Sequence, residues 1–114
     1  MRIEKSHHLI LNRHINLELK KVFGNDFKFK LNFENHIQNI KSKGTLKSIN
    51  ETGILVIPFN TSFSILTRVN KMILRLLEDF YLYVYNIKNK INFNFKVVTN
   101  LLPQQSYNIQ LELL

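Results

Sequence analysis

The hydrophobic positions in the second half of the chain recur with a helical period. They are separated by alternating steps of three and four residues, which is the spacing of one face of an α-helix. The positions are Leu66, Val69, Ile73, Leu76 and Phe80. Asn60, Thr61 and Ser62 precede this stretch, and their side chains are of the kinds that cap a helix N-terminus. The pattern predicts a long helix from about residue 60 to residue 80, which continues to a turn at 86–89.

The residues before this helix predict a β-hairpin. Residues 54–57 form a short apolar run, ILVI, that is broken by Pro58. Residues 45–50 can form another short strand, and residues 51–53 (ETG) have the composition of a tight turn between the two. Because proline removes a hydrogen-bond donor from the ladder, we expect the second strand to lie at an edge or to leave the sheet at this point.

The N-terminal region predicts an arm and a first helix. Apolar residues between Leu11 and Phe23 follow helical spacing, and Gly24 supplies a C-terminal stop. Two lysines in the last turn have the sign of charge that favours a helix C-terminus. We therefore expect a helix over residues 9–23, preceded by an N-terminal arm formed by residues 1–8.

The next segment combines two periods. Residues 27–33 (FKFKLNF) alternate apolar and polar side chains, and this period alone indicates a strand. From Phe33 the spacing changes to steps of four and three, through Ile37 and Ile40. We interpret the segment as an extended lead-in followed by a second, short helix that ends near Lys43.

The C-terminal part predicts one strand and an extension. Apolar and polar residues alternate over residues 91–98, and alternate again over 107–113 after Pro103. The last segment fits either a C-terminal strand or a peptide that binds a partner. The whole is an α+β fold in the order α-α-β-β-α-β, with a small sheet covered by helices on one face. We expect a single domain over 1–114, with a core at 9–98 and a C-terminal extension at 99–114.

The charge of the chain favours an anionic partner. Lys and Arg outnumber Asp and Glu by 16 to 8, which gives a formal charge of +8 and a pI near 9.9. Ala and Trp are absent while Asn, Ile and Lys are abundant, a composition typical of AT-rich genomes, and this weakens the charge argument. Cys is also absent, and no window approaches the ~18 apolar residues of a membrane span. We expect a cytoplasmic protein or, alternatively, one of an organellar matrix.

The sequence carries no catalytic or metal-binding signature. It has no glycine-rich phosphate loop and no nucleophile motif, and the acidic pair Glu78-Asp79 diverges by ~100° on a helix. His7, His8 and His14 are close in sequence but lack further ligand types, and we expect no metal site. His36 is expected on the surface of the second helix. We therefore expect neither an enzyme nor a cofactor.

Basic residues are the remaining candidate for a functional surface. Arg68, Lys71 and Arg75 are three and four residues apart, so they share one stripe of the long helix. Lys41, Lys43 and Lys47 form a second group after the short helix. We take both groups as candidate nucleic-acid-binding residues. The alternative is a solvated, lysine-rich surface with no ligand.

The order of elements resembles that of the DciA family of bacterial replicative-helicase loaders. It is also shared by type II KH-like folds and by the N-terminal domain of the initiator DnaA. The resemblance covers roughly residues 9–98 and is one of apolar spacing. The segments that carry it are residues 15–24 (INLELKKVFG), 33–40 (FENHIQNI), 48–59 (SINETGILVIPF), 60–80 (NTSFSILTRVNKMILRLLEDF) and 90–97 (KINFNFKV).

The resemblance implies binding without chemistry. A DciA-like chain would bind the replicative helicase DnaB and single-stranded DNA. The implied partner surface is the corner before the long helix, Asn60, Thr61, Ser62 and Phe63. The chain departs from the family in having Phe33 where Trp is usual, and it lacks the GxxG loop with which true KH domains clamp RNA.

Three functions remain open on this evidence. The first is a replication adaptor that binds helicase or single-stranded DNA with an affinity that falls as salt rises. The second is a ribosomal or ribosome-associated RNA-binding protein of an AT-rich bacterium or organelle. The third is an assembly module for an acidic protein. The sequence does not indicate an oligomeric state.

Overall fold

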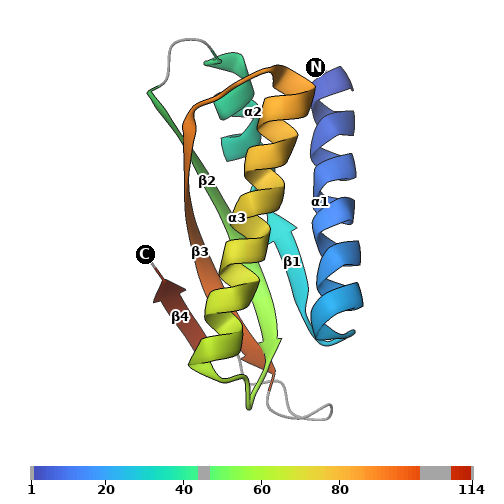
Figure 1. The fold of residues 1–114 in the computed structure, drawn as a ribbon, viewed down its shortest axis with the longest axis vertical. Coiled ribbons are helices and arrows are strands. Elements are labelled where there is room, and N and C mark those ends of the chain that lie inside the picture. The colour runs from blue at the N-terminus through green and yellow to red at the C-terminus, as the bar shows by residue number, and fades with distance from the viewer. Residues whose placement is uncertain (1, 44–46, 101–108, 114) are drawn as a thin grey trace.

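The computed structural model describes residues 2–43, 47–100 and 109–113. Within these ranges it contains three helices and four strands, and Figure 1 shows the two long helices side by side in front of the strands. The elements are α1 (Arg2–Phe23), β1 (Lys28–Leu31), α2 (Phe33–Lys41), β2 (Ser48–Pro58), α3 (Phe63–Tyr85), β3 (Lys90–Asn100) and β4 (Ile109–Leu113). The predicted α+β class, with three helices and a small sheet, is confirmed.

The strands form one mixed sheet in the order β1-β2-β3-β4. Its centre is the parallel pair of β2 and β3, whose register runs from Ser48 opposite Lys90 to Pro58 opposite Asn100. Parallel neighbours require a crossover connection, and α3 provides it. The outer strands β1 and β4 pair antiparallel with β2 and β3 respectively.

Only one face of the sheet is covered by the described helices. In β1, β2 and β3 the odd-numbered side chains are mostly buried, while the even-numbered ones are exposed or half-buried. The odd positions pack against the inner faces of α1 and α3 in a single hydrophobic core. This core includes Leu11, Ile15 and Leu19 of α1, Val69, Ile73 and Leu77 of α3, and Ile49, Leu55, Ile91 and Val97 of the strands.

The expected N-terminal arm is wrong, because α1 begins at Arg2 and includes residues 2–8. Tertiary contacts hold its first turns against other helices. The Nδ1 atom of His7 lies 2.9 Å from the hydroxyl of Tyr85 at the end of α3. The ring of His8 is buried and lies edge-on to Phe33 of α2. The predicted end of this helix at Phe23 is confirmed.

The expected hairpin is also wrong, because β2 runs through residues 51–53 without a turn. Gly53 lies in the middle of the sheet, between Leu31 of β1 and Phe95 of β3. Glu51 is buried and is bonded by side chains of α2 and α3. Residues 51–53 therefore have the composition of a turn but serve as the centre of a strand. Residues 44–46 of the expected first strand lie outside the described residues.

The extended lead-in and the second helix are confirmed. β1 pairs with β2, and α2 then begins at Phe33, one residue later than the N-cap Asn32. The side-chain oxygen of Asn32 accepts a hydrogen bond from the backbone N–H of Asn35 at 3.0 Å. The helix ends at Lys41, close to the expected end.

The long helix is confirmed at both ends. Ser62 is its N-cap and accepts a hydrogen bond from the backbone N–H of Ile65 at 3.2 Å. Asn86 ends it in the left-handed conformation (φ 55°), a role for which Asn is suited. The buried stripe follows the expected positions to Ile73 and then shifts to Leu77 and Tyr81, so Leu76 and Phe80 are only half-buried. The shift brings the Tyr81 hydroxyl to the buried carboxylate of Glu51.

The strand expected over residues 91–98 is confirmed and is slightly longer. Of the two alternatives for the C-terminal alternation, the structure has the strand, since β4 pairs antiparallel with β3. Residues 101–108 and 114 of the expected extension lie outside the described residues.

Gly53→Ala tests why β2 carries a glycine at its centre. A Cβ atom there would lie 2.6 Å from the Phe29 ring and 2.7 Å from the backbone oxygen of Lys30, closer than such atoms approach. We expect a loss of about 1–3 kcal/mol in the free energy of unfolding, measured by chemical denaturation. Thr52→Ala, at the adjacent position on the opposite face, is the control. Equal stability of Gly53→Ala and wild type would contradict this packing.

Candidate nucleic-acid interface

The uncovered face of the sheet presents lysines on both sides of an apolar residue. In the register of the sheet, Lys30 of β1, Ile54 of β2 and Lys96 of β3 lie directly across from one another. All three side chains are exposed. Neighbouring strands lie about 4.8 Å apart, so the two lysine backbones are roughly 10 Å apart with Ile54 midway between them. This row is the most regular basic arrangement in the described structure.

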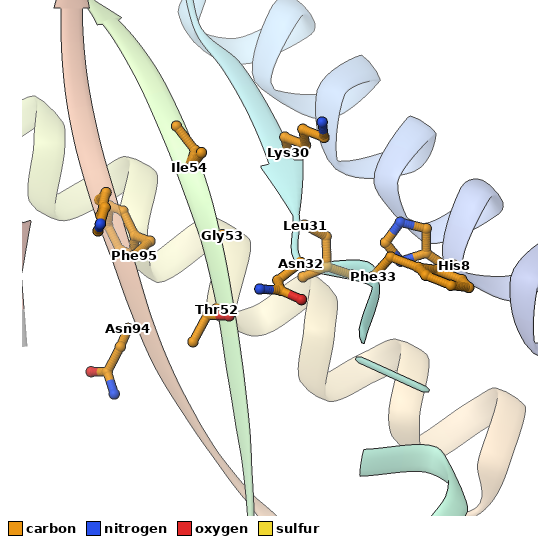
Figure 2. Close-up of a pocket in the computed structure, with 11 residues that line it drawn as sticks. His8, Lys30, Leu31, Asn32, Phe33, Thr52, Gly53, Ile54, Asn94 and Phe95 are labelled. Carbon is orange, nitrogen blue, oxygen red and sulfur yellow. The ribbon is translucent and has the colours of Figure 1, made fainter. Parts of the chain in front are cut away.

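The three residues of this row also line a hollow of about 620 Å³. Figure 2 shows Thr52 and Ile54 of β2 and Asn94 of β3 around it, with Asn32 and Phe33 at the end of β1. The lining combines apolar surface, one aromatic ring, amides and a hydroxyl. Such a combination is typical of sites that hold a ligand by its apolar body and orient it through a few polar groups.

The charge on this face is predominantly positive. Lys28, Lys30, Lys90 and Lys96 occupy even positions of β1 and β3 and are exposed. Glu51 of β2 points to the opposite, covered face, where it is buried. Glu112 of β4 is opposite Lys96 in the register and is the one acidic residue at an even position of the described strands. The face therefore favours an anionic ligand.

The stripe predicted on α3 is exposed as expected. Arg68, Lys71 and Arg75 all face solvent. The guanidinium of Arg68 lies 5.7 Å from the centroid of the Phe23 ring, so part of its charge is engaged in a cation–π contact within the protein. Glu78 and Asp79 are exposed one turn beyond Arg75. These carboxylates reduce the positive potential at that end of the stripe.

The second predicted group is separate from the first. Lys41, Lys43 and Lys47 are exposed at the end of α2 and just before β2. In Figure 1 this part of the chain lies at the end of the molecule where α3 finishes, whereas Arg68 belongs to the beginning of α3. The structure therefore does not gather the two groups into one surface.

The predicted partner corner is held by hydrogen bonds and exposes aromatic surface. The hydroxyl of Thr61 donates a hydrogen bond to the backbone oxygen of Pro58 at 2.7 Å. Ser62 caps α3, and Asn60 is exposed. Phe63, the fourth predicted residue, is 75% exposed. Phe59, four residues earlier in the chain, is 53% exposed and was not among the residues predicted from the sequence.

A buried polar cluster joins α2, β2 and α3. The Nδ1 atom of His36 lies 2.7 Å from Oε2 of Glu51, and the hydroxyl of Tyr81 donates a hydrogen bond to the same oxygen. The Tyr81 hydroxyl is also 3.2 Å from Nδ1 of His36. His36 and Glu51 are 0% exposed and Tyr81 is 1% exposed. The expectation that His36 lies on the helix surface is therefore wrong, since α2 turns this side chain into the core.

The cluster has the residue types of an acid–base site but not the access. Burial, and then the charge of Glu51 and the hydrogen bond to it, raise the pKa of Tyr81, so this hydroxyl remains a donor at neutral pH. No substrate reaches three side chains that are sealed from solvent. Glu51 is instead the buried acceptor that connects two helices to the central strand, and it stabilises their positions.

His8 extends this cluster toward the hollow. Its ring centroid lies 4.8 Å from that of Phe33 and 5.6 Å from that of His36, and it contributes to the lining of the hollow. Burial, and then the nearby charge of His36, lower the pKa of His8 to about 4. His8 is therefore neutral at physiological pH and acts as an aromatic packing residue.

Neither a metal-ligand cluster nor a membrane-spanning helix was found in the ranges that the structure describes. There, no three His, Cys, Asp or Glu side chains come close enough to hold a metal ion, including His7, His8 and His14. None of the described helices combines the length and the apolar character that a bilayer crossing requires.

Comparison of the chain with protein-family models, curated proteins and solved structures gives no match. The resemblance to the DciA family is thus neither supported nor contradicted by a relative. It stays a prediction based on apolar spacing. The candidate site consequently rests on the geometry and charge of this molecule alone.

Tyr81→Phe tests the role of the buried cluster. The substitution keeps the ring but removes the hydroxyl that donates to Glu51. Because a buried carboxylate then loses a partner, we expect the free energy of unfolding to fall by about 1–3 kcal/mol in denaturant titrations. Tyr83→Phe is the matched control, since Tyr83 is 80% exposed on the same helix. Equal stability of the two variants would contradict a stabilising role for the cluster.

The lowered pKa of His8 predicts a pH dependence of stability. The folded protein holds His8 neutral down to about pH 4, whereas the unfolded chain protonates it near its ordinary pKa of 6.5. The contribution of neutral His8 to the free energy of unfolding is therefore fully present above pH 6.5 and is lost as the pH falls toward 4. Wild type should lose more unfolding free energy over this window than His8→Gln.

His14→Gln is the control for this titration, because His14 is exposed on the same helix. The pH profile of His8→Gln should differ from that of wild type by more than the profile of His14→Gln does. The prediction is contradicted if the difference in unfolding free energy between wild type and His8→Gln stays constant from pH 7 to pH 4. His8 would then titrate alike in the folded and unfolded states.

Proposed function

We propose that the protein is a non-enzymatic adaptor that binds single-stranded nucleic acid on the uncovered face of its sheet. The observation that carries this proposal is the row formed by Lys30, Ile54 and Lys96. Lysines on both sides of an exposed apolar residue suit a strand that presents phosphates and bases together. The formal charge of +8 supports the same class of ligand.

The sheet face is favoured over the stripe on α3 for two reasons. First, its lysines are arranged on strands that hydrogen bonds hold at fixed spacing, so they can match a regular phosphate backbone. Second, the guanidinium of Arg68 in the α3 stripe already contacts the Phe23 ring within the protein. The long-range attraction of the nucleic acid would then include a contribution from Lys41, Lys43 and Lys47.

The proposal assigns no chemistry to the protein. The groups best suited to acid–base catalysis, His36, Glu51 and Tyr81, lie in the core and are explained by their contribution to stability. The sheet face offers lysines, amides and hydroxyls, which bind and orient a ligand. A binding role accounts for these groups without a reaction.

A protein partner is the second part of the proposal. The DciA resemblance implies the replicative helicase, and the corner formed by Asn60, Thr61, Ser62 and Phe63 is where it would bind. Phe59 and Phe63 support this choice because both rings are largely exposed, one on each side of the corner, and exposed aromatic rings are frequent anchors of protein interfaces. Recovery of DnaB with the wild type, but not with Phe59→Ser/Phe63→Ser, would support it. Recovery of the protein in salt-washed ribosomal subunits would contradict it.

Two triple variants with the same change in charge test the binding surface. One is Lys28→Gln/Lys30→Gln/Lys96→Gln on the sheet, and the other is Arg68→Gln/Lys71→Gln/Arg75→Gln on α3. Binding of oligo-dT is measured by fluorescence anisotropy over a range of salt concentrations. We expect the sheet variant to bind about tenfold more weakly or worse, with a shallower salt dependence, since each lost phosphate contact removes about 0.7 from the slope.

The α3 variant controls for the loss of net charge and should bind within about threefold of wild type. A larger loss for the α3 variant than for the sheet variant would move the site to the helix. Failure of the wild type to bind, or an affinity that does not change with salt, would overturn the proposed function.

A further inference from the structure

The hollow beside the lysine row has features that phosphate binding alone does not require. Part of its wall is apolar, whereas contacts to phosphate are made by cations and polar groups. We infer that the hollow holds one unstacked base of the bound strand and gives the protein a base preference. This inference rests on the proposed function. It adds that the site recognises a single base of the nucleic acid.

The apolar part of the hollow fits the face of a base. Ile54 is 43% exposed and Phe33 is 40% exposed, so both keep apolar surface in contact with water. Phe33 is held by its edge-on contact with His8, which is itself buried. A base placed against these side chains would remove their surface from water, and an aromatic ring adds stacking. The volume of about 620 Å³ leaves room for a single base.

The lysines fit the phosphates on either side of that base. Lys30 and Lys96 are one strand away from Ile54 in opposite directions. A base that lies against Ile54 therefore has a cation on each side, in the direction across the strands. The nucleic-acid strand is expected to cross β1, β2 and β3 along this row. Its charge is complementary to the face, which makes a polyanion the occupant that the surface favours.

The polar end of the hollow provides the means to distinguish bases. Thr52 and Asn94 lie opposite each other, two residues along from Ile54 and Lys96 and on the same face of the sheet. The Asn94 side chain is exposed, and its amide offers both a donor and an acceptor, which can pair with the edge of a base. By contrast, the amide of Asn92 is bonded to Asn50 at 3.3 Å in the next row. Asn94 is therefore the residue that we assign to base recognition.

The experiment compares homopolymeric strands of equal length. Affinities of the full chain for oligo-dT, oligo-dC and oligo-dA are measured by fluorescence anisotropy at one salt concentration. Wild type should prefer one of them by about fivefold or more, as expected for one specific base contact. Asn94→Leu should reduce this preference to less than about twofold while leaving the salt dependence unchanged, because the lysines are intact.

Two further variants make the result specific. Asn92→Leu removes a neighbouring amide from the same strand and should keep the preference of wild type. Thr52→Val keeps the shape of the side chain without its hydroxyl and should weaken the preference. Each variant is checked for an unchanged thermal unfolding midpoint.

The outcomes separate this inference from the proposed function. Equal affinity of wild type for all three strands, with a normal salt dependence, would overturn base recognition and leave the adaptor proposal standing. A preference that survives in both Asn94→Leu and Thr52→Val would also overturn it. Failure to bind any strand would overturn the proposed function itself.

Discussion

The parallel pairing of β2 with β3 is the constraint on which the rest of the structure depends. Eleven consecutive residues of each strand lie in register, and α3 must cross the sheet to connect them. The crossover places α3 beside α1 on one face, and the side chains at odd positions fill the space between. The same pairing leaves the even positions in water, including Ile54 and Lys96. The register of β2 and β3 therefore determines both which side chains form the core and which form the candidate binding surface.

A buried carboxylate accompanies this arrangement. Glu51 lies at an odd position of β2 and would be costly to bury without partners. His36 and Tyr81 reach it from α2 and α3, so the three elements are joined at one atom, Oε2. The network fixes α2 against β2 and α3, and Phe33, the first residue of α2, lines the hollow. A polar cluster inside the core therefore helps to shape the open face on the other side.

The spacing of apolar residues predicted the helices and strands that are set by the sequence nearby. Helical spacing identified α3 and its ends, and alternation identified β1 and β3. The prediction of a hairpin was wrong because residues 51–53 have the composition of a turn. In the structure, the roles of Glu51 and Gly53 are set by residues that are distant in the sequence. Glu51 is bonded to residues 15 and 30 positions away, and Gly53 makes room for the ring of Phe29. Likewise, the first turns of α1 depend on His7 meeting Tyr85, 78 residues later.

The candidate site shows the same division. Sequence reasoning recognised excess positive charge and found the stripe on α3, because helical geometry alone aligns its members. The row of Lys30, Ile54 and Lys96 joins three strands whose order and register no local pattern reveals. The most direct test of the account is an NMR titration of the labelled protein with oligo-dT. The account predicts that the largest backbone amide shifts lie around this row, in β1, β2 and β3. Shifts confined to α3 around Arg68, Lys71 and Arg75 would contradict it.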